Sequence, residues 1–69
     1  MSSENFDVKV DSPSDTITYV GKAARLSPSS SQVWQIKRID TGTLAADISW
    51  SDGTDKFDKV WDDRATYTY

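Results

Sequence analysis

The sequence predicts a mainly β fold, either a small antiparallel sheet or an SH3-like barrel, with one short helical turn near the C-terminus. The first observation behind this prediction is that Glu4 is the only Glu among 11 acidic residues. The remaining acids are Asp, which favours turns over helix interiors because its short side chain bonds nearby backbone N–H groups. The second is the abundance of Ser and Thr, which act in the same way. The third is the alternation of apolar and polar residues on both sides of Gly42.

Length and composition narrow the possible functions. A chain of 69 residues forms one domain, and at this size the hydrophobic core is modest. There is no Cys and no His, which excludes disulfides, Cys/His zinc sites and catalysis by either side chain. The net charge of −3 argues against a nucleic-acid binder. No segment is apolar enough to span a membrane, and residues 1–4 lack a signal-peptide pattern, so we expect a cytosolic product.

Residues 1–16 are interpreted as an N-terminal arm or tail, and residues 17–69 as a single small β domain. Phe6, Val8 and Val10 alternate with polar residues, which is the period of a strand. The segment 12–15 then contains a Pro between Ser residues and predicts a break. Two interpretations stay open. The arm is either a partly ordered tail or an extended strand that pairs with the sheet edge of a neighbouring subunit.

The central part of the chain predicts strands in order. Residues 16–19 are rich in β-branched and aromatic side chains and predict a strand, followed by a looser segment at 21–25 and a surface loop at 27–31. Residues 33–51 predict an antiparallel hairpin around a turn at 40–43. In its first strand Trp34 and Ile36 share a face, and in its second Ile48 and Trp50 do.

The period changes after Gly53. Phe57, Val60, Trp61 and Arg64 are spaced like one face of a helix, which predicts a helical turn near 56–63. Residues 66–69 alternate again and predict a final strand. Because the three Trp residues lie in different elements, we expect them to meet in one core. The predicted core comprises Trp34, Ile36, Ile48, Trp50, Phe57, Val60 and Trp61.

The densest polar cluster contains Asp52, Asp55, Asp58, Asp62 and Asp63 among basic residues. Their spacing does not match a 12-residue calcium loop, which alternates oxygen ligands and ends in a Glu. We therefore interpret them as turn caps and exposed ion pairs, and leave calcium binding by the first three as an open alternative. Arg64, one turn beyond Trp61, is expected to lie on the indole or to bond Asp62 or a neighbouring carbonyl.

No arrangement of residues predicts an enzyme or a cofactor site. Ser and Thr are plentiful, but no His is present to activate one, and no GxSxG or SxxK motif occurs. The three Gly residues are isolated, so no phosphate-binding loop is expected. Trp34 with Lys37 and Arg38 is the best patch for stacking single-stranded nucleic acid. A Trp on the apolar face of a hairpin is far more often part of a core.

The stretch from Tyr19 to Tyr69 resembles a group of short proteins encoded by tailed bacteriophages, often among their structural genes. The resemblance covers about three quarters of the chain. Its two most distinctive parts are Trp34-Gln35-Ile36-Lys37-Arg38 and Phe57-Asp58-x-Val60-Trp61-Asp62-Asp63-Arg64. It also includes Tyr19-Val20-Gly21-Lys22-Ala23, Ile39-Asp40, Trp50-Ser51-Asp52-Gly53 and Tyr67.

The resemblance implies a phage accessory or virion component, with no catalytic residue or cofactor to carry over. The expected function is a non-enzymatic virion structural protein, a capsid decoration or head–tail accessory located in the virion and, before assembly, in the host cytoplasm. Its partners would be capsid or neck proteins or a second copy of the chain, with no nucleic acid or membrane. The alternatives are a non-virion phage protein that binds a host factor and a small nucleic-acid-binding barrel. The predicted interface residues are Phe6, Val8, Val10, Arg64, Tyr67 and Tyr69.

Overall fold

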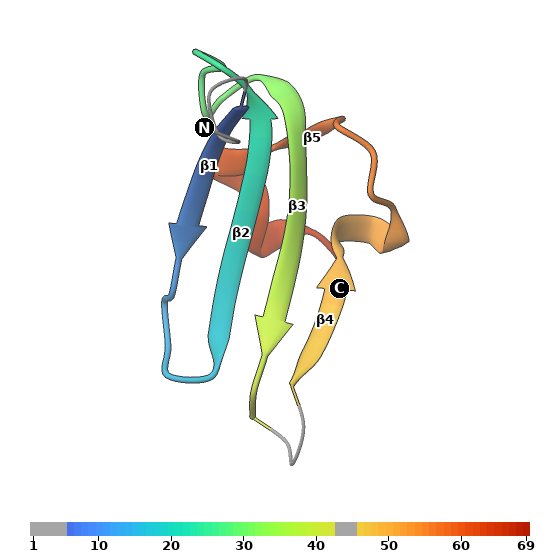
Figure 1. Ribbon diagram of the computed structural model, residues 1–69. Helices are drawn as coiled ribbons and strands as arrows, with labels where there is room; N and C mark the ends of the chain where they lie inside the picture. The colour runs from blue at the N-terminus through green and yellow to red at the C-terminus, as the bar shows by residue number, and fades with distance from the viewer. Residues whose placement is uncertain (1–5, 43–45) are drawn as a thin grey trace.

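The chain folds into an open antiparallel sheet covered on one side by its C-terminal segment. The computed structural model describes residues 6–42 and 46–69. The four main strands are neighbours in chain order: β1 (Phe6–Asp11), β2 (Ile17–Ala24), β3 (Gln32–Asp40) and β4 (Asp47–Trp50). A two-residue strand, β5 (Lys59–Val60), pairs with the start of β3. The mainly β prediction is therefore confirmed, as an open sheet rather than a barrel (Figure 1).

Two short 3₁₀ helices complete the fold. The first, η1 (Ser51–Gly53), turns the chain out of β4, and the second, η2 (Trp61–Thr66), follows β5. The helical turn predicted near 56–63 thus exists but begins later, because Lys59 and Val60 are extended and pair with β3. The predicted final strand at 66–69 is wrong, since Thr66 still belongs to η2 and no strand follows it.

Residues 6–11 of the predicted arm belong to the sheet. β1 pairs with β2 along its whole length, from Phe6 opposite Ala24 to Asp11 opposite Tyr19. The domain therefore begins before residue 17, and β1 is an edge strand that pairs with β2 of its own chain. Residues 1–5 of the arm lie outside the described residues. The segment 21–25, predicted to be loose, is instead the second half of β2 up to Ala24.

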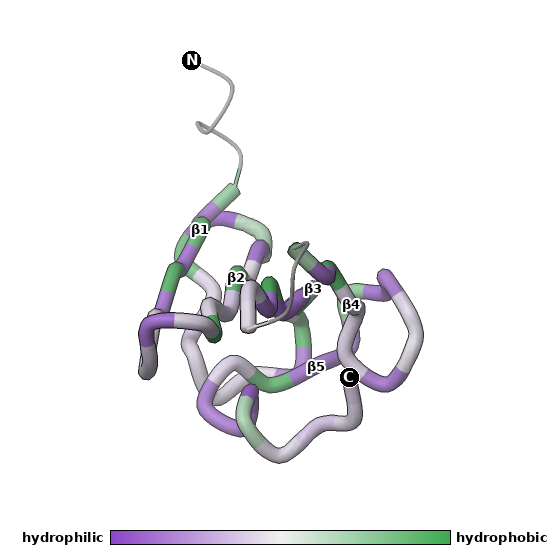
Figure 2. The backbone as a smooth tube through the Cα atoms, turned by 90° about the horizontal axis from the view of Figure 1, so that it is seen from below, coloured by the Kyte–Doolittle hydropathy of each residue, from purple (hydrophilic) through white to green (hydrophobic). Residues whose placement is uncertain are grey.

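The core lies between the sheet and the C-terminal segment, which runs behind β1–β3 in Figure 1 and on one side of the sheet in Figure 2. The indole rings of Trp34 and Trp61 pack at 6.0 Å between centroids and 42° between planes. Gly21 gives this pair its space, because a Cβ there would lie 2.4 Å from an atom of the Trp61 ring. The buried apolar residues are Tyr19, Ala23, Trp34, Ile36 and Trp61.

The core prediction is correct for three residues and wrong for three. Trp34, Ile36 and Trp61 are buried, and Val60 is half-buried. Ile48, Trp50 and Phe57 are instead exposed, at 60%, 36% and 45% of their surface. For the β4 pair the reason is the hairpin register, which pairs Ile39 with Ile48. Residues directly opposite each other in a sheet share a face, and successive residues alternate, so Ile48 and Trp50 face away from Trp34 and Ile36.

Candidate interaction surface

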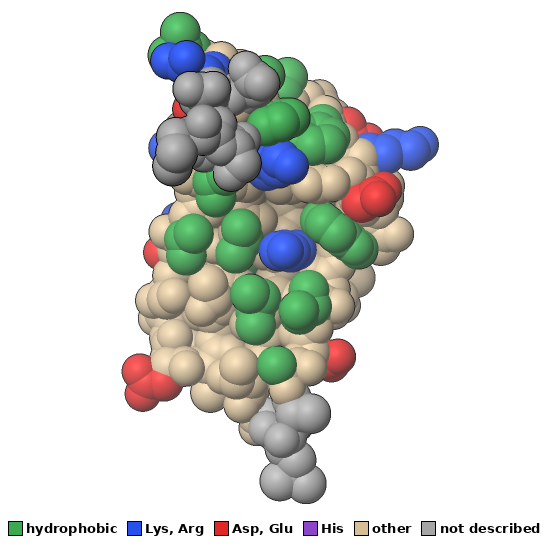
Figure 3. All heavy atoms as spheres, in the orientation of Figure 1, with side chains coloured by type: hydrophobic (Ala, Val, Ile, Leu, Met, Phe, Trp, Pro, Cys, Tyr) green, Lys and Arg blue, Asp and Glu red, His purple; other side chains and the backbone are tan. Residues whose placement is uncertain are grey.

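Within residues 6–42 and 46–69, one face of the sheet has no covering layer, and we call it the outer face. The strand registers place one set of alternating residues of β1–β4 on this side, opposite the core. The outer face comprises Phe6, Val8 and Val10 of β1; Thr18, Val20 and Lys22 of β2; Gln35, Lys37 and Ile39 of β3; and Ile48 and Trp50 of β4. Figure 3 shows this side, with hydrophobic side chains gathered around basic ones and acidic side chains toward the margins.

The apolar side chains of the outer face remain accessible to water. Val10, Ile48 and Val8 expose 65%, 60% and 54% of their surface, and Phe6 and Trp50 more than a third. Val20 and Ile39 lie between them and are half-buried by their neighbours. Isolated apolar residues are normal on a protein surface, whereas a contiguous apolar patch marks an interaction site. The outer face is contiguous, because its members are direct or diagonal neighbours on adjacent strands.

Two lysines provide the only charges at the outward positions of the four strands within the described residues. The Lys22 ammonium lies 4.3 Å from the Phe6 ring centroid, and that of Lys37 lies 5.8 Å from the Trp50 ring. These are cation–π distances, worth about 0.5–1 kcal/mol each at an exposed site. Because Lys22 is opposite Gln35, it is the diagonal neighbour of Lys37, and Cα atoms in this relation are about 7–8 Å apart.

Neither lysine has an acidic residue opposite it in the sheet. Sheets commonly place an opposite charge across from a charged residue, but Lys22 faces Val8 and Gln35, and Lys37 faces Val20 and Trp50. The outer face therefore has positive charge, apolar area and no carboxylate at its strand positions.

Three residues predicted to lie at an interface turn inward instead. The Arg64 guanidinium stacks on the Trp61 ring at 4.7 Å, donates to the Trp61 carbonyl, and forms an ion pair with Asp11 at 2.9 Å. The predicted contact with the indole is confirmed, and the ion pair joins η2 to the edge strand β1. Tyr67 and Tyr69 pack against the core cluster. Of the predicted interface residues, only Phe6, Val8 and Val10 lie on the outer face.

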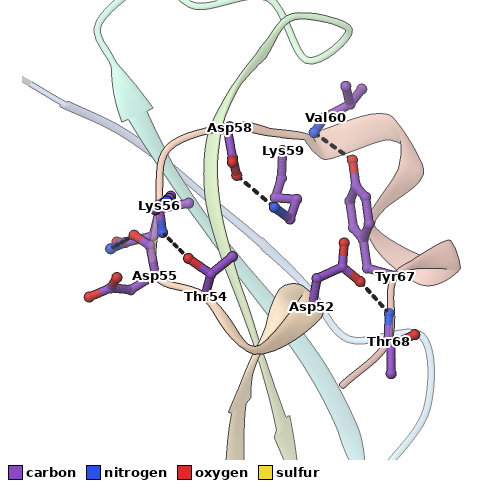
Figure 4. A network of polar contacts seen from close by, with 10 residues as sticks. Asp52, Thr54, Asp55, Lys56, Asp58, Lys59, Val60, Tyr67 and Thr68 are labelled. Carbon is purple, nitrogen blue, oxygen red and sulfur yellow. Dashed lines mark hydrogen bonds and ion pairs between the residues drawn. The ribbon is translucent and has the colours of Figure 1, made fainter.

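The two tyrosines also act through their hydroxyl groups. The Tyr67 hydroxyl accepts a hydrogen bond from the Val60 amide at 2.8 Å (Figure 4). The Tyr69 hydroxyl donates to the Arg64 carbonyl at 2.7 Å. Burial, reinforced by the nearby Tyr19, raises the pKa of Tyr69 to about 12, whereas Arg38 acts in the opposite direction. The hydroxyl bonds therefore connect residues within the C-terminal segment, and the rings pack this segment against the core of the sheet.

The acidic cluster is divided among separate partners (Figure 4). Asp52 accepts a hydrogen bond from the Thr68 amide, and Asp58 forms an ion pair with Lys59 at 2.6 Å. The hydrogen bond from Lys59 lowers the pKa of the Asp58 carboxyl below its usual value. The Asp55 carbonyl accepts from the Gln35 side chain. Within residues 6–42 and 46–69, no group of three or more acidic side chains is arranged to hold a metal ion.

The surface of the described chain also contains no pocket. Its one fully buried hydroxyl side chain, Ser51, has no hydrogen-bond partner among the described residues, but it is closed off from any substrate. The sequence matches no family model, and no curated protein or solved structure shows significant similarity to it. No helix in the described ranges is long and apolar enough to cross a membrane.

Sequence reasoning found part of the outer face and missed the rest. It selected the β1 residues because they alternate with polar ones, but it assigned Ile48 and Trp50 to the core and singled out neither Lys22 nor Lys37 with them. The signal that joins these residues is the pairing register of β3 and β4, which sets Lys37 opposite Trp50 and Ile39 opposite Ile48. Residues 48 and 50 therefore share a face with residues 39 and 37 rather than with 34 and 36.

Proposed function

We propose that this protein is a non-enzymatic docking module, a structural accessory of a tailed-phage particle that attaches through its outer face. The observation that carries the proposal is the contiguous apolar patch on the uncovered side of the sheet, which extends from Val8 and Val10 on β1 to Ile48 and Trp50 on β4. The sequence resemblance to short phage proteins is the reason for proposing a phage particle as the partner. An exposed apolar face of this kind would serve either capsid decoration or attachment at the head–tail junction.

Attachment in many copies suits a surface of this size. A small domain offers only a limited contact area, and a single contact of that size is weak. A symmetric particle presents the same site repeatedly, so each copy finds an equivalent position and neighbouring copies support one another. The bound chain also gains stability, because a partner that binds only the folded state shifts the folding equilibrium toward it. This gain matters for a domain with only five buried apolar side chains among its described residues.

The experiment is quantitative mass spectrometry of purified particles from the phage that encodes the chain. We expect the protein in a copy number that matches a symmetric set of sites. Particles made without the chain should then recover it on addition of the pure protein. Val10→Asp and Ile48→Asp should weaken this recovery more than tenfold, because each places a carboxylate in the apolar patch, whereas Ser30→Asp on an exposed loop should not.

Absence from particles would overturn the proposal. The capture of one specific host protein without particle association would instead support a host-binding role. Normal recovery of Val10→Asp and Ile48→Asp would leave the virion role intact but would show that a different surface docks. Thermal unfolding of each variant separates these outcomes from misfolding, since both residues are exposed and their replacement should change the melting temperature little.

A further inference from the structure

We infer that the occupant of the outer face is a protein surface that combines apolar side chains with carboxylates. This inference rests on the proposed function only in taking the outer face as the docking surface. It is carried by the charges: Lys22 and Lys37 are the charged residues at the outward strand positions, and each is held over an aromatic ring rather than paired with an acid among residues 6–42 and 46–69. A partner carboxylate would supply the missing opposite charge.

The lysine spacing defines the partner further. Lys22 and Lys37 are diagonal neighbours on β2 and β3, a position at which Cα atoms are about 7–8 Å apart. Two acidic residues at i and i+2 on an extended strand are about 7 Å apart and lie on one face. Residues at i and i+4 on a helix are about 5–6 Å apart between Cβ atoms, and long side chains can bridge the difference. Apolar residues next to such a pair would cover Val8, Val20 and Ile39.

A second copy of the chain fits this face poorly. Two outer faces brought together would bury four lysines without a carboxylate from any outward strand position. Like charges set against each other across an interface are a strong determinant against pairing. The apolar side chains alone would favour self-association, so the lysines act against it and leave the face to a partner of opposite charge.

Nucleic acid is also disfavoured. Single-stranded nucleic acid stacks its bases on aromatic rings and aligns its phosphates with a basic groove. The outer face offers two rings, each beneath a lysine, while most of its apolar area comes from Val and Ile, which have no π face. The whole chain carries a net charge of −3, which opposes a phosphate backbone at longer range.

The test is an NMR titration of the full-length ¹⁵N-labelled chain with a random copolymer of Glu and Tyr. The Lys–Tyr copolymer is the probe of reversed charge, an oligothymidylate represents nucleic acid, and a dilution series of the chain represents self-association. We expect the Glu–Tyr copolymer to shift amide signals of Val8, Val20, Lys22 and Lys37 and the Trp50 indole signal. Binding should weaken several-fold between about 50 and 300 mM NaCl because the contact includes exposed charges.

Charge-reversal variants make the test specific. Lys22→Glu and Lys37→Glu should each weaken binding of the Glu–Tyr copolymer about tenfold. Lys56→Glu is the matched control, since it makes the same charge change at an exposed site outside the outer face and should alter binding less than twofold. If all three variants weakened binding equally, the net charge of the chain would explain the result, and the inference would be overturned.

Three further outcomes would overturn it as well. These are the absence of outer-face shifts with the Glu–Tyr copolymer, tighter binding of oligothymidylate at the same signals, and shifts of the same signals on concentrating the chain alone. None of them depends on particles. If the chain binds particles through the outer face but shows no preference for the acidic probe, the docking role stands and the acidic partner is wrong.

Discussion

Replacing Gly21 with Ala would place a methyl group where the core has no room for it. An ideal Cβ at Gly21 lies 2.4 and 2.6 Å from two ring atoms of Trp61, and 3.2 Å from a ring atom of Trp34. Carbon atoms in contact prefer about 3.5–4.0 Å, so the first two distances are severe overlaps. The φ angle of Gly21 is not in the left-handed region, so this close approach, rather than backbone strain, is what requires Gly.

The cost follows from two opposing effects. In the absence of a clash, Ala would stabilise the strand by about 0.5–1 kcal/mol, because Gly loses more conformational freedom on folding. Overpacking a tight core costs about 1–3 kcal/mol or more. Neither indole can move freely, since Trp34 donates a hydrogen bond to the Pro28 carbonyl and Trp61 lies under the Arg64 guanidinium. The overpacking cost should therefore lie near the upper end of its range, about 3 kcal/mol, and subtracting the gain from Ala leaves a net loss of about 2 kcal/mol.

The assay is urea or thermal unfolding followed by circular dichroism. For a domain of this size, about 2 kcal/mol corresponds to a drop of about 8–16 °C in melting temperature. Gly42→Ala is the control, because among the described residues its Cβ would meet nothing closer than the Asp40 carboxylate at 3.1 Å. We expect that variant to stay within about 1 kcal/mol of the natural chain. A Gly21→Ala protein as stable as the natural chain would refute the packing argument for the two indoles.

Three further predictions concern single side chains. Trp61→Ala should lower the free energy of unfolding by about 3–5 kcal/mol and Trp50→Ala by about 1–2 kcal/mol, because only Trp61 is buried. Equal losses in urea unfolding would contradict the assignment of the two residues to opposite faces. Leu26→Gly should raise the free energy of unfolding by about 0.5–1 kcal/mol, since Leu26 has φ 63° and exposes 86% of its surface; a loss of stability would reveal a contact that Leu26 makes. The pKa of Tyr69 is raised to about 12, so the folded state favours the protonated phenol. Its contribution to stability is therefore complete below pH 10 and is lost as the pH rises to 12. The free energy of unfolding of Tyr69→Phe should depend less on pH in this range, and an identical pH profile would contradict the burial of this phenol.

The hairpin could be predicted from the sequence because its information is local. Alternation on both sides of Gly42 identifies two strands, and the short connection requires them to be antiparallel. The register could not be predicted in the same way. It depends on how many residues the turn takes up, and a change of one residue exchanges the faces of a whole strand. This is why Trp34 and Ile36 were placed correctly while Ile48 and Trp50 were not.

The C-terminal segment shows a second limit of sequence reasoning. The spacing of Phe57, Val60 and Trp61 fits a helix, but Lys59 and Val60 add to the free edge of β3. Pairing with a strand more than 20 residues away is not encoded in a local period. The contact between Trp61 and Arg64 survived this error, because residues three apart also lie together in a 3₁₀ helix.

The core and the proposed docking surface lie on opposite faces of the same strands, so stability and binding should be separable by substitution. Each strand alternates between the two faces, so Gly21 and Trp34 belong to the core while Val20 and Lys22 belong to the outer face. A substitution at a core position should therefore lower stability, and binding should fall only as the folded population falls. A substitution at an outer position should lower affinity at unchanged stability. If outer-face variants consistently unfolded the chain, the sheet would need that face for its own stability, and the case for a docking surface would fail.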